Sequence, residues 1–209
     1  MNIIELLKKT LDNPVVFNSF ERMMGVNKTR ETLVREYIRP NKNSLVLDIG
    51  CGTGDFRNFL PEDLTYIGID TSNKYIEFAK KKKFKNSKFY CCGINEISNI
   101  TDIQKSKFDI IISIGVIHHL DEKLFNDLVE KSFSVLNNDG YLVTYDPVFK
   151  DKQNRISRFL IENDRGEYVR NESGYTSILK KIFPRLETFQ VNNLQYLPYD
   201  VLITKAYKK

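Results

Sequence analysis

Five short apolar runs alternate with segments of helical hydrophobic spacing through much of the chain. Each run is short enough to be a strand, and the segments between the runs are long enough for the crossover helices that parallel strands need. The pattern therefore predicts an α/β fold with a mostly parallel sheet and helices on both faces. The predicted strands cover residues 45–49, 66–69, 88–92, 108–114 and 141–145.

Two further strand-like runs, residues 186–191 and 200–206, lie near the end of the chain and are joined by a loop that contains Pro198. So short a connection suits antiparallel strands, because parallel neighbours need a longer crossover. The sequence therefore predicts a Rossmann-like sheet of seven strands whose last two form an antiparallel pair.

The helices between these strands are predicted from apolar residues at helical spacing and from capping residues. The predicted helices cover residues 56–60, 72–82, 121–136 and 174–183. Ser173 is the expected N-cap of the last one. The helix over 121–136 is expected to end in a left-handed turn at residues 137–140 (Asn-Asn-Asp-Gly), because these residue types tolerate that conformation.

The length of 209 residues predicts a single domain over 1–209. Residues 1–40 have helical character and are expected to form an N-terminal cap on the sheet. Residues 149–172 are charged, with one short helical pattern, and are expected to form an insertion on the substrate side.

Composition excludes several classes of protein. Hydrophobic residues make up 41% and charged residues 28% of the chain, which is typical of globular domains and not of disordered or fibrous ones. The longest stretch of apolar or small residues, 110–117, is far shorter than the ~20 residues that span a bilayer. Because the N-terminus has no signal-peptide pattern either, we expect a cytoplasmic protein.

The net charge of +5 is modest, and acidic residues separate most of the basic ones, so a nucleic-acid partner is not expected. The three cysteines, Cys51, Cys91 and Cys92, are too few and too badly spaced for a disulfide framework. With only two histidines and no CxxC pair, the sequence gives no reason to expect a metal site.

The most informative segment is the glycine-rich loop that follows the first predicted strand. Asp48 is followed by Gly50, Gly52 and Gly54, and a helical pattern begins directly afterwards. The spacing is neither the GxGxxG of dinucleotide-binding proteins nor a nucleotide P-loop. An acidic residue, Asp70, ends the second strand, where a carboxylate can accept hydrogen bonds from both hydroxyls of a ribose.

The loop and Asp70 together resemble motif I and the ribose-binding acidic residue of class I S-adenosylmethionine-dependent methyltransferases. Residues 108–120 resemble the fourth strand of that family and its exit, and residues 138–143 resemble the turn into the fifth strand. The resemblance implies a Rossmann-like fold, methyl transfer, and S-adenosylmethionine as cofactor.

Carried over to this chain, the resemblance places the methionine moiety at Asp48 and the backbone around Gly50 and Gly52, and the ribose at Asp70. Many relatives have an aspartate after the third strand that contacts adenine, but this chain has Cys92-Gly93-Ile94-Asn95 there. Adenine would instead meet the backbone of Gly93 and Ile94, or Asn95. The complete set of expected cofactor contacts is Asp48, Gly50, Cys51, Gly52, Asp70, Thr71, Gly93, Ile94 and Ile114.

Two adjacent histidines follow the fourth strand, beside the expected cofactor cleft. A hydroxyl group is a poor nucleophile until a positioned base accepts its proton, and histidine suits this task near neutral pH. Asp146 ends the fifth strand at the same edge of the sheet. We expect His118 to act as the base with Asp146 orienting its imidazole, and His119 is the alternative base.

The stretch after the fifth strand borders the same cleft and carries arginines and tyrosines. Arg165, Arg170 and Tyr175 are the expected substrate contacts, because arginine binds anionic groups and tyrosine packs on sugars or bonds to hydroxyls. A small bacterial methyltransferase subgroup, whose members are often encoded among surface-polysaccharide genes, has a similar pattern to this part of the chain. The residues that resemble it are Asp146-Pro147, Asp164-Arg165-Gly166, Val169-Arg170, Tyr175 and Leu197-Pro198-Tyr199. That resemblance implies O-methylation of a sugar hydroxyl, on a small molecule or a glycan.

Three alternative functions stay open. N-methylation of a small amine would need less basic catalysis. Methylation of a nucleic-acid base is disfavoured, because the fourth strand lacks the [ND]PP[YF] pattern and the chain has no basic arm. A subunit that binds S-adenosylmethionine without turnover is the non-catalytic alternative.

Overall fold

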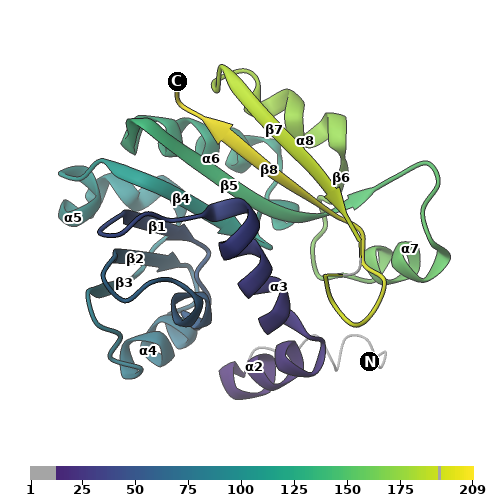
Figure 1. The fold of residues 1–209 in the computed structure, drawn as a ribbon, viewed down its shortest axis with the longest axis horizontal. Helices are drawn as coiled ribbons and strands as arrows, with labels where there is room; N and C mark the ends of the chain where they lie inside the picture. Colours follow the sequence, from purple (N-terminus) through teal and green to yellow (C-terminus); the bar gives the residue numbers. More distant parts are fainter. Residues whose placement is uncertain (1–12, 193) are drawn as a thin grey trace.

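The computed structural model describes residues 13–192 and 194–209. The chain folds into one continuous twisted sheet with helices on both faces (Figure 1). The strand order is β3-β2-β1-β4-β5-β8-β7, and a short β6 pairs with β5 outside this path. The seven-stranded Rossmann-like sheet predicted from the sequence is confirmed. The strands are β1 (Leu45–Ile49), β2 (Thr65–Asp70), β3 (Ser87–Cys91), β4 (Phe108–Ile114), β5 (Leu136–Phe149), β6 (Arg170–Asn171), β7 (Arg185–Val191) and β8 (Val201–Tyr207).

Strands β1 to β5 pair in parallel, whereas β8 pairs antiparallel with both β5 and β7. The predicted antiparallel C-terminal pair is therefore confirmed. The last strand, β8, lies beside β5, and β7 forms the edge of the sheet.

The central strands are buried on both faces, as strands of a parallel sheet covered by helices must be. Val46 and Leu47 of β1 are fully buried, and so are Ile111 and Ile112 of β4. Their side chains alternate between two apolar cores, one on each face of the sheet.

Different helices close the two cores. On one face lie η3 (Ile94–Asn99), α5 (Thr101–Gln104), α6 (Glu122–Val135) and α8 (Glu172–Leu179). On the other face lie η1 (Leu33–Ile38), η2 (Asp55–Phe59) and α4 (Asn73–Lys81). The remaining helical segments are α2 (Pro14–Met23), α3 (Val26–Thr32), η4 (Ile117–His119) and α7 (Arg155–Glu162).

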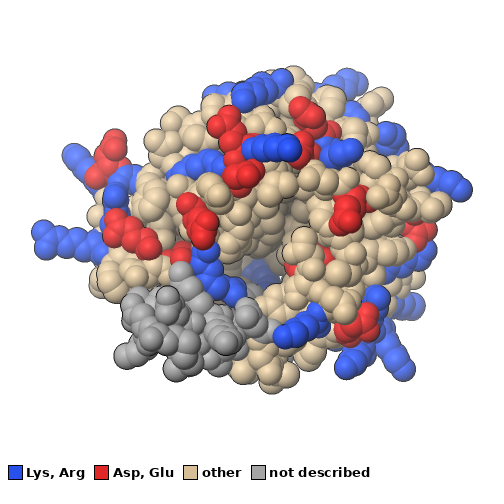
Figure 2. Space-filling view, turned by 180° about the vertical axis from the view of Figure 1, so that it is seen from behind, with Lys and Arg blue, Asp and Glu red and all other residues tan. Residues whose placement is uncertain are grey.

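Residues 1–12 of the expected N-terminal cap lie outside the described residues, and the described part of that segment is mostly helical. Among the helices of the described ranges, none combines the length and apolar character needed to cross a bilayer. On the face seen in Figure 2, acidic side chains are interspersed with the basic ones, and the surface is hollowed near its centre.

Three local predictions need correction. Helix α6 ends at Val135 and Leu136 is already extended, while residues 137–140, all of them described, have no positive φ. No left-handed turn is needed, because β5 starts directly and Asn137 Nδ2 donates to Asp109 Oδ1 of β4 (2.6 Å). The N-cap of α8 is Asn171, whose side chain accepts the N–H of Gly174, and not Ser173. The segment after the glycine loop, η2, is a 3-10 helix.

A buried arginine fixes the chain after the glycine loop. Arg57 of η2 is only 4% exposed, and its guanidinium donates to four backbone carbonyls and one hydroxyl. Such multiple hydrogen bonding compensates for removing a cation from water. The acceptors are the carbonyls of Leu60 and Pro61 (3.1 Å each), the carbonyls of Glu62 and Lys85 (3.3 Å each) and Ser87 Oγ (3.0 Å).

We expect Arg57→Met to lower the free energy of unfolding by about 3 kcal/mol, because four carbonyls lose a charged donor that methionine cannot replace. Urea denaturation measures the change. Arg35→Met is the matched control, since the Arg35 side chain is 71% exposed, and it should change the free energy by less than about 0.5 kcal/mol. Equal effects of the two substitutions would contradict the role assigned to Arg57.

Candidate active site

A cavity of ≈ 830 Å³ opens at the carboxyl ends of β1, β2, β4 and β5. Its size lies within the range of small-molecule sites, and its position is the place where open α/β sheets bind ligands. Strand residues such as Asp48, Asp70, Ile114 and Tyr145 line its floor. The nine cofactor contacts predicted from the sequence all line this cavity.

The glycine loop forms one wall of the cavity and is held tightly to β2. The N–H groups of Gly50 and Cys51 both donate to the carbonyl of Ile69, at 2.8 and 2.9 Å. Gly50 has φ +78°, and a Cβ there would lie 2.3 Å from Val116 Cγ2. Both the backbone conformation and the space exclude a side chain at position 50.

Asp70, the next residue of β2, also holds this loop. One oxygen of its carboxylate accepts the N–H of Gly52 (2.9 Å) and the other accepts the N–H of Ser72 (2.8 Å). Burial raises the pKa of Asp70, while these two N–H donors oppose the shift. Each carboxylate oxygen keeps a further lone pair, so Asp70 can still accept hydrogen bonds from a diol.

Asp48 lies deeper in the cavity and is 2% exposed. It accepts a hydrogen bond from the hydroxyl of Tyr66. Burial raises the pKa of Asp48 to about 7, although the Tyr66 hydrogen bond opposes the shift, and the charge of Asp70 adds to it. A cationic group of a ligand beside Asp48 would therefore strongly favour the charged form of this carboxyl.

These residues fit S-adenosylmethionine. Asp70 offers acceptors for a ribose, Asp48 offers a carboxyl for an ammonium group, and Ile94 offers an apolar surface at the wall where adenine is expected. A Cβ built on Gly52 would meet nothing within 4 Å, so the loop backbone at this point faces open cavity.

The two histidines lie on η4, the short turn that follows β4. His118 is 5% exposed, and a single oxygen of Asp146, Oδ1, contacts both its backbone N (3.1 Å) and its ring Nδ1 (2.8 Å). Asp146 lies within β5 and not after its end, because β5 continues to Phe149. The expected pairing of His118 with Asp146 is thus present as a contact, and it turns Nε2 of His118 away from the strand.

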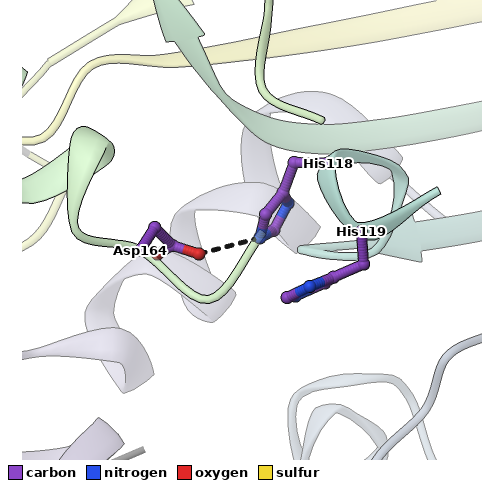
Figure 3. A group of neighbouring side chains, drawn as sticks. All are labelled: His118, His119 and Asp164. Atoms are coloured by element: carbon purple, nitrogen blue, oxygen red, sulfur yellow. Dashed lines mark ion pairs between the residues drawn. The ribbon is translucent and has the colours of Figure 1, made fainter. Parts of the chain in front are cut away.

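A second carboxylate reaches the other ring nitrogen. Asp164, in the loop after α7, lies with Oδ1 3.3 Å from His118 Nε2 (Figure 3). Its other oxygen accepts the hydroxyl of Tyr199 (2.8 Å), and its loop is tied to η4 by the N–H of Tyr168, which donates to the His118 carbonyl (2.8 Å). No local sequence pattern predicted the contact of Asp164 with His118, and Asp164 belongs only to the residues that carry the subgroup resemblance.

The electrostatics of the two histidines differ sharply. Burial opposes a charge on His118, but hydrogen bonds and charge from Asp146 and Asp164 outweigh it and raise the pKa to about 9. Burial and the neighbouring His118 lower the pKa of His119 to about 4. Burial alone would raise the pKa of Asp164, yet His118 holds it well below its usual range. Near neutral pH His118 is therefore charged, and His119 is neutral.

The three expected substrate contacts are not brought together. Arg165 lines the cavity, whereas Arg170 and Tyr175 are absent from the described residues of its wall. The guanidinium of Arg170 donates to three carbonyls, among them those of Ile117 (3.3 Å) and Leu120 (2.8 Å), and so clamps the histidine turn from behind. Tyr175 is 2% exposed and donates to the carbonyl of Pro147 (2.9 Å). Both side chains bond to backbone carbonyls in this structure, and their contact with substrate stays a prediction.

Further cavity residues come from segments far away in the sequence. Their side chains belong to loops and to the N-terminal helices, where no motif signals a ligand contact. They include Met24, Thr29, Leu33, Phe159, Asn163, Gln195, Leu197 and Tyr199. Only the fold, and no local sequence pattern, brings them to the cavity.

A protein-family profile described as "Methyltransferase domain" matches residues 40–193, which include the glycine loop, Asp70 and both histidines. The chain belongs to the class I S-adenosylmethionine-dependent methyltransferases. Its cofactor is S-adenosylmethionine, as the sequence analysis predicted.

The methyltransferase is similar to curated proteins with different reactions. It is 30% identical over 126 residues to carboxy-S-adenosyl-L-methionine synthase of Campylobacter concisus, covering 58% of this chain and 51% of that protein. It is 29% identical over 126 residues to the ubiquinone biosynthesis O-methyltransferase of Pelagibacter ubique, covering 58% and 49%. The chain thus spans about half the length of these relatives.

The fold is shared with a solved methyltransferase. The N-methyltransferase NodS from Bradyrhizobium japonicum, crystallised with S-adenosyl-L-homocysteine, superposes with a TM-score of 0.63 at 20% identity, covering 90% of this chain and 87% of that one. At this level of identity the likeness concerns the fold alone.

We expect Asp70→Ala to weaken the binding of S-adenosylhomocysteine at least about tenfold, because the variant loses the ribose acceptors and releases the N–H groups of Gly52 and Ser72. Isothermal titration calorimetry measures the affinity. Asp139→Ala is the control, since the Asp139 side chain is 91% exposed on the surface. Unchanged affinity in Asp70→Ala would contradict this assignment.

Asp48 gives a pH-dependent prediction. Because its folded pKa of about 7 exceeds the unfolded value of about 3.9, its contribution to stability is full below about pH 4 and is lost as the pH rises towards 7. In Asp48→Asn this loss is absent. Without cofactor, the variant should therefore lose about 2 kcal/mol less unfolding free energy than wild type between about pH 5 and about pH 8. Urea denaturation at both pH values measures it, and parallel losses in the two proteins would contradict the shift.

Proposed function

We propose that the methyltransferase transfers a methyl group to a hydroxyl oxygen of a small molecule, and that the acceptor is a sugar of a surface polysaccharide or of its precursor. The observation that carries the O-methylation is the histidine pair at the cavity, with His118 oriented by Asp146. Methylating a hydroxyl requires removal of its proton, and an oriented imidazole is suited to that task.

When bound, S-adenosylmethionine supplies a methyl group made electrophilic by the positive sulfur. The protein then has to align the acceptor with that methyl group and accept its proton. Asp146 Oδ1 holds the ring of His118 by Nδ1 at 2.8 Å and stabilises its charged form. Asp164 pairs with Nε2 in the structure and helps to raise the pKa of His118. The acceptor hydroxyl therefore has to take the place of Asp164 at Nε2, and the loss of this carboxylate neighbour favours the neutral imidazole that can accept the proton.

The outer part of the cavity supports a polar acceptor. Asn163, Arg165, Gln195 and Tyr199 line it and offer both hydrogen-bond donors and acceptors. Exposed apolar side chains such as Phe159, which is 62% exposed, can pack on the apolar face of a sugar ring.

One observation favours N-methylation of a small amine as the second candidate. The carboxylate of Asp164 lies at the cavity beside the ring of Tyr199, and such a pair suits an ammonium group. Among the relatives, the names include both an O-methyltransferase and an N-methyltransferase. Our preference for oxygen therefore rests on the histidine pair.

We expect His118→Ala and His119→Ala each to lower turnover at least about tenfold while the affinity for S-adenosylhomocysteine stays within about twofold of wild type. The measurement is S-adenosylhomocysteine release on two panels of acceptors, nucleotide-sugars with simple glycosides and small primary amines. Lys123→Ala, an exposed position on the neighbouring helix α6, is the control.

Activity confined to the amine panel, or full activity of both histidine variants on hydroxyl acceptors, would overturn the proposal of histidine-assisted O-methylation. Activity only on hydroxyl acceptors other than sugars would support O-methylation and overturn the proposal that the acceptor is a sugar.

A further inference from the structure

Three potential metal ligands converge in the cavity wall. His118, His119 and Asp164 each offer one ligand atom, and these atoms all lie within 4.8 Å of one another (Figure 3). The histidines come from η4 and the aspartate comes from the loop after α7, so two segments about 45 residues apart in the sequence form the group. The set of two imidazoles and one carboxylate is a common one for divalent transition metals.

The spacing between His118 and Asp164 fits a shared cation. His118 Nε2 and Asp164 Oδ1 are 3.3 Å apart, which is longer than the ~2.7–2.9 Å of a well-formed charge-assisted hydrogen bond. In a tetrahedral site with bonds of about 2.0–2.1 Å, neighbouring ligand atoms lie about 3.3–3.4 Å apart. His119 lines the same cavity, and its ligand nitrogen lies within 4.8 Å of the other two ligand atoms.

The surroundings of His118 are those of a metal ligand. Asp146 Oδ1 lies 2.8 Å from Nδ1 and also accepts the backbone N–H of the same residue, so the ring is fixed with Nε2 towards Asp164. Ligating histidines usually make such a contact through their second nitrogen, which fixes their orientation. The second oxygen of Asp164 is fixed in turn by the hydroxyl of Tyr199 (2.8 Å).

We propose that His118, His119 and Asp164 bind a divalent transition-metal cation, with Asp146 as the carboxylate that supports His118. Three protein ligands leave at least one coordination position open, and this position faces the cavity. The cation takes the place of the direct contact between His118 Nε2 and Asp164 Oδ1.

The role of the cation rests on the proposed function, whereas its binding does not. A hydroxyl held at the open position is more acidic than a free one, and its proton passes to solvent through the cavity mouth. The acceptor oxygen then forms a bond to the methyl carbon, and the carbon–sulfur bond breaks with its electron pair left on sulfur. With the cation bound, the two histidines serve as its ligands, and solvent takes the role of base that the proposed function gives to His118 in the metal-free protein.

Titration of the full chain with CoCl₂ tests the site, because Co²⁺ in a three-ligand protein site gives visible absorption bands that depend on the donor atoms. The chain has two histidines, so imidazole ligation can come only from His118 and His119. We expect one Co²⁺ per chain, displaced by ZnCl₂. His119→Ala and Asp164→Asn should each weaken binding at least about tenfold, whereas Asp139→Asn should leave it unchanged.

Thiols are the competing donors. Cys51 is buried, and the double variant Cys91→Ser/Cys92→Ser removes the two thiols that are more exposed. We expect this variant to bind Co²⁺ as wild type does, without thiolate charge-transfer bands. Absence of Co²⁺ binding at millimolar concentration would overturn the inference, and so would binding that His119→Ala and Asp164→Asn leave intact. Retained S-adenosylhomocysteine binding in both variants shows that they are folded.

The failure of this inference and the failure of the proposed function give different results. If turnover on hydroxyl acceptors is unaffected by a chelator but is lowered by the histidine substitutions, the proposed metal site is wrong and the proposed O-methylation stands. Specific Co²⁺ binding without turnover on any hydroxyl acceptor would support the metal site and overturn the proposed function.

Discussion

The site depends on the neighbouring positions of β1 and β4 at the centre of the sheet. From β1 the chain builds outward through β2 and β3, and from β4 it builds in the opposite direction through β5. The connections at this point diverge to opposite sides, so no crossover covers the carboxyl ends of β1 and β4, and a cavity forms there. Because both strands are buried on both faces, their positions are rigid, and the short turns that follow them inherit that rigidity.

What the sequence predicted well is what is encoded locally. The strands, the glycine loop and Asp70 follow from hydrophobic runs and turn residues within a few positions of one another, and they lie where expected. Such local patterns could not predict contacts between segments that are far apart in the sequence. Asp164 meets His118 only because the loop after α7 folds back onto η4, and Arg170 faces backbone carbonyls because that same fold turns it away from the cavity. The left-handed turn at residues 137–140 failed because β5 pairs with β4 from its first residue.

A polar chain of four side chains crosses the cavity wall, in the order Asp146, His118, Asp164 and Tyr199. Its members come from β5, from the turn after β4, from the loop after α7 and from the segment before β8. A substitution of any of the other three side chains therefore changes the surroundings of the His118 imidazole. The loop after α7 is joined to His118 by the Asp164 ion pair and by the N–H of Tyr168, which donates to the His118 carbonyl, so a movement of this loop changes the surroundings of the imidazole.

Gly166 allows the loop after α7 to lie close to His118. A Cβ at position 166 would lie 2.0 Å from His118 Cδ2 and 2.8 Å from the carbonyl oxygen of the same residue. The loop after α7 can approach the histidine so closely only because it has no side chain at this point. The exposed face of α7 is under no such restriction. Substitutions of the α7 residues that line the cavity, such as Phe159 and Leu160, can thus change its shape while the approach of the loop to His118 stays the same.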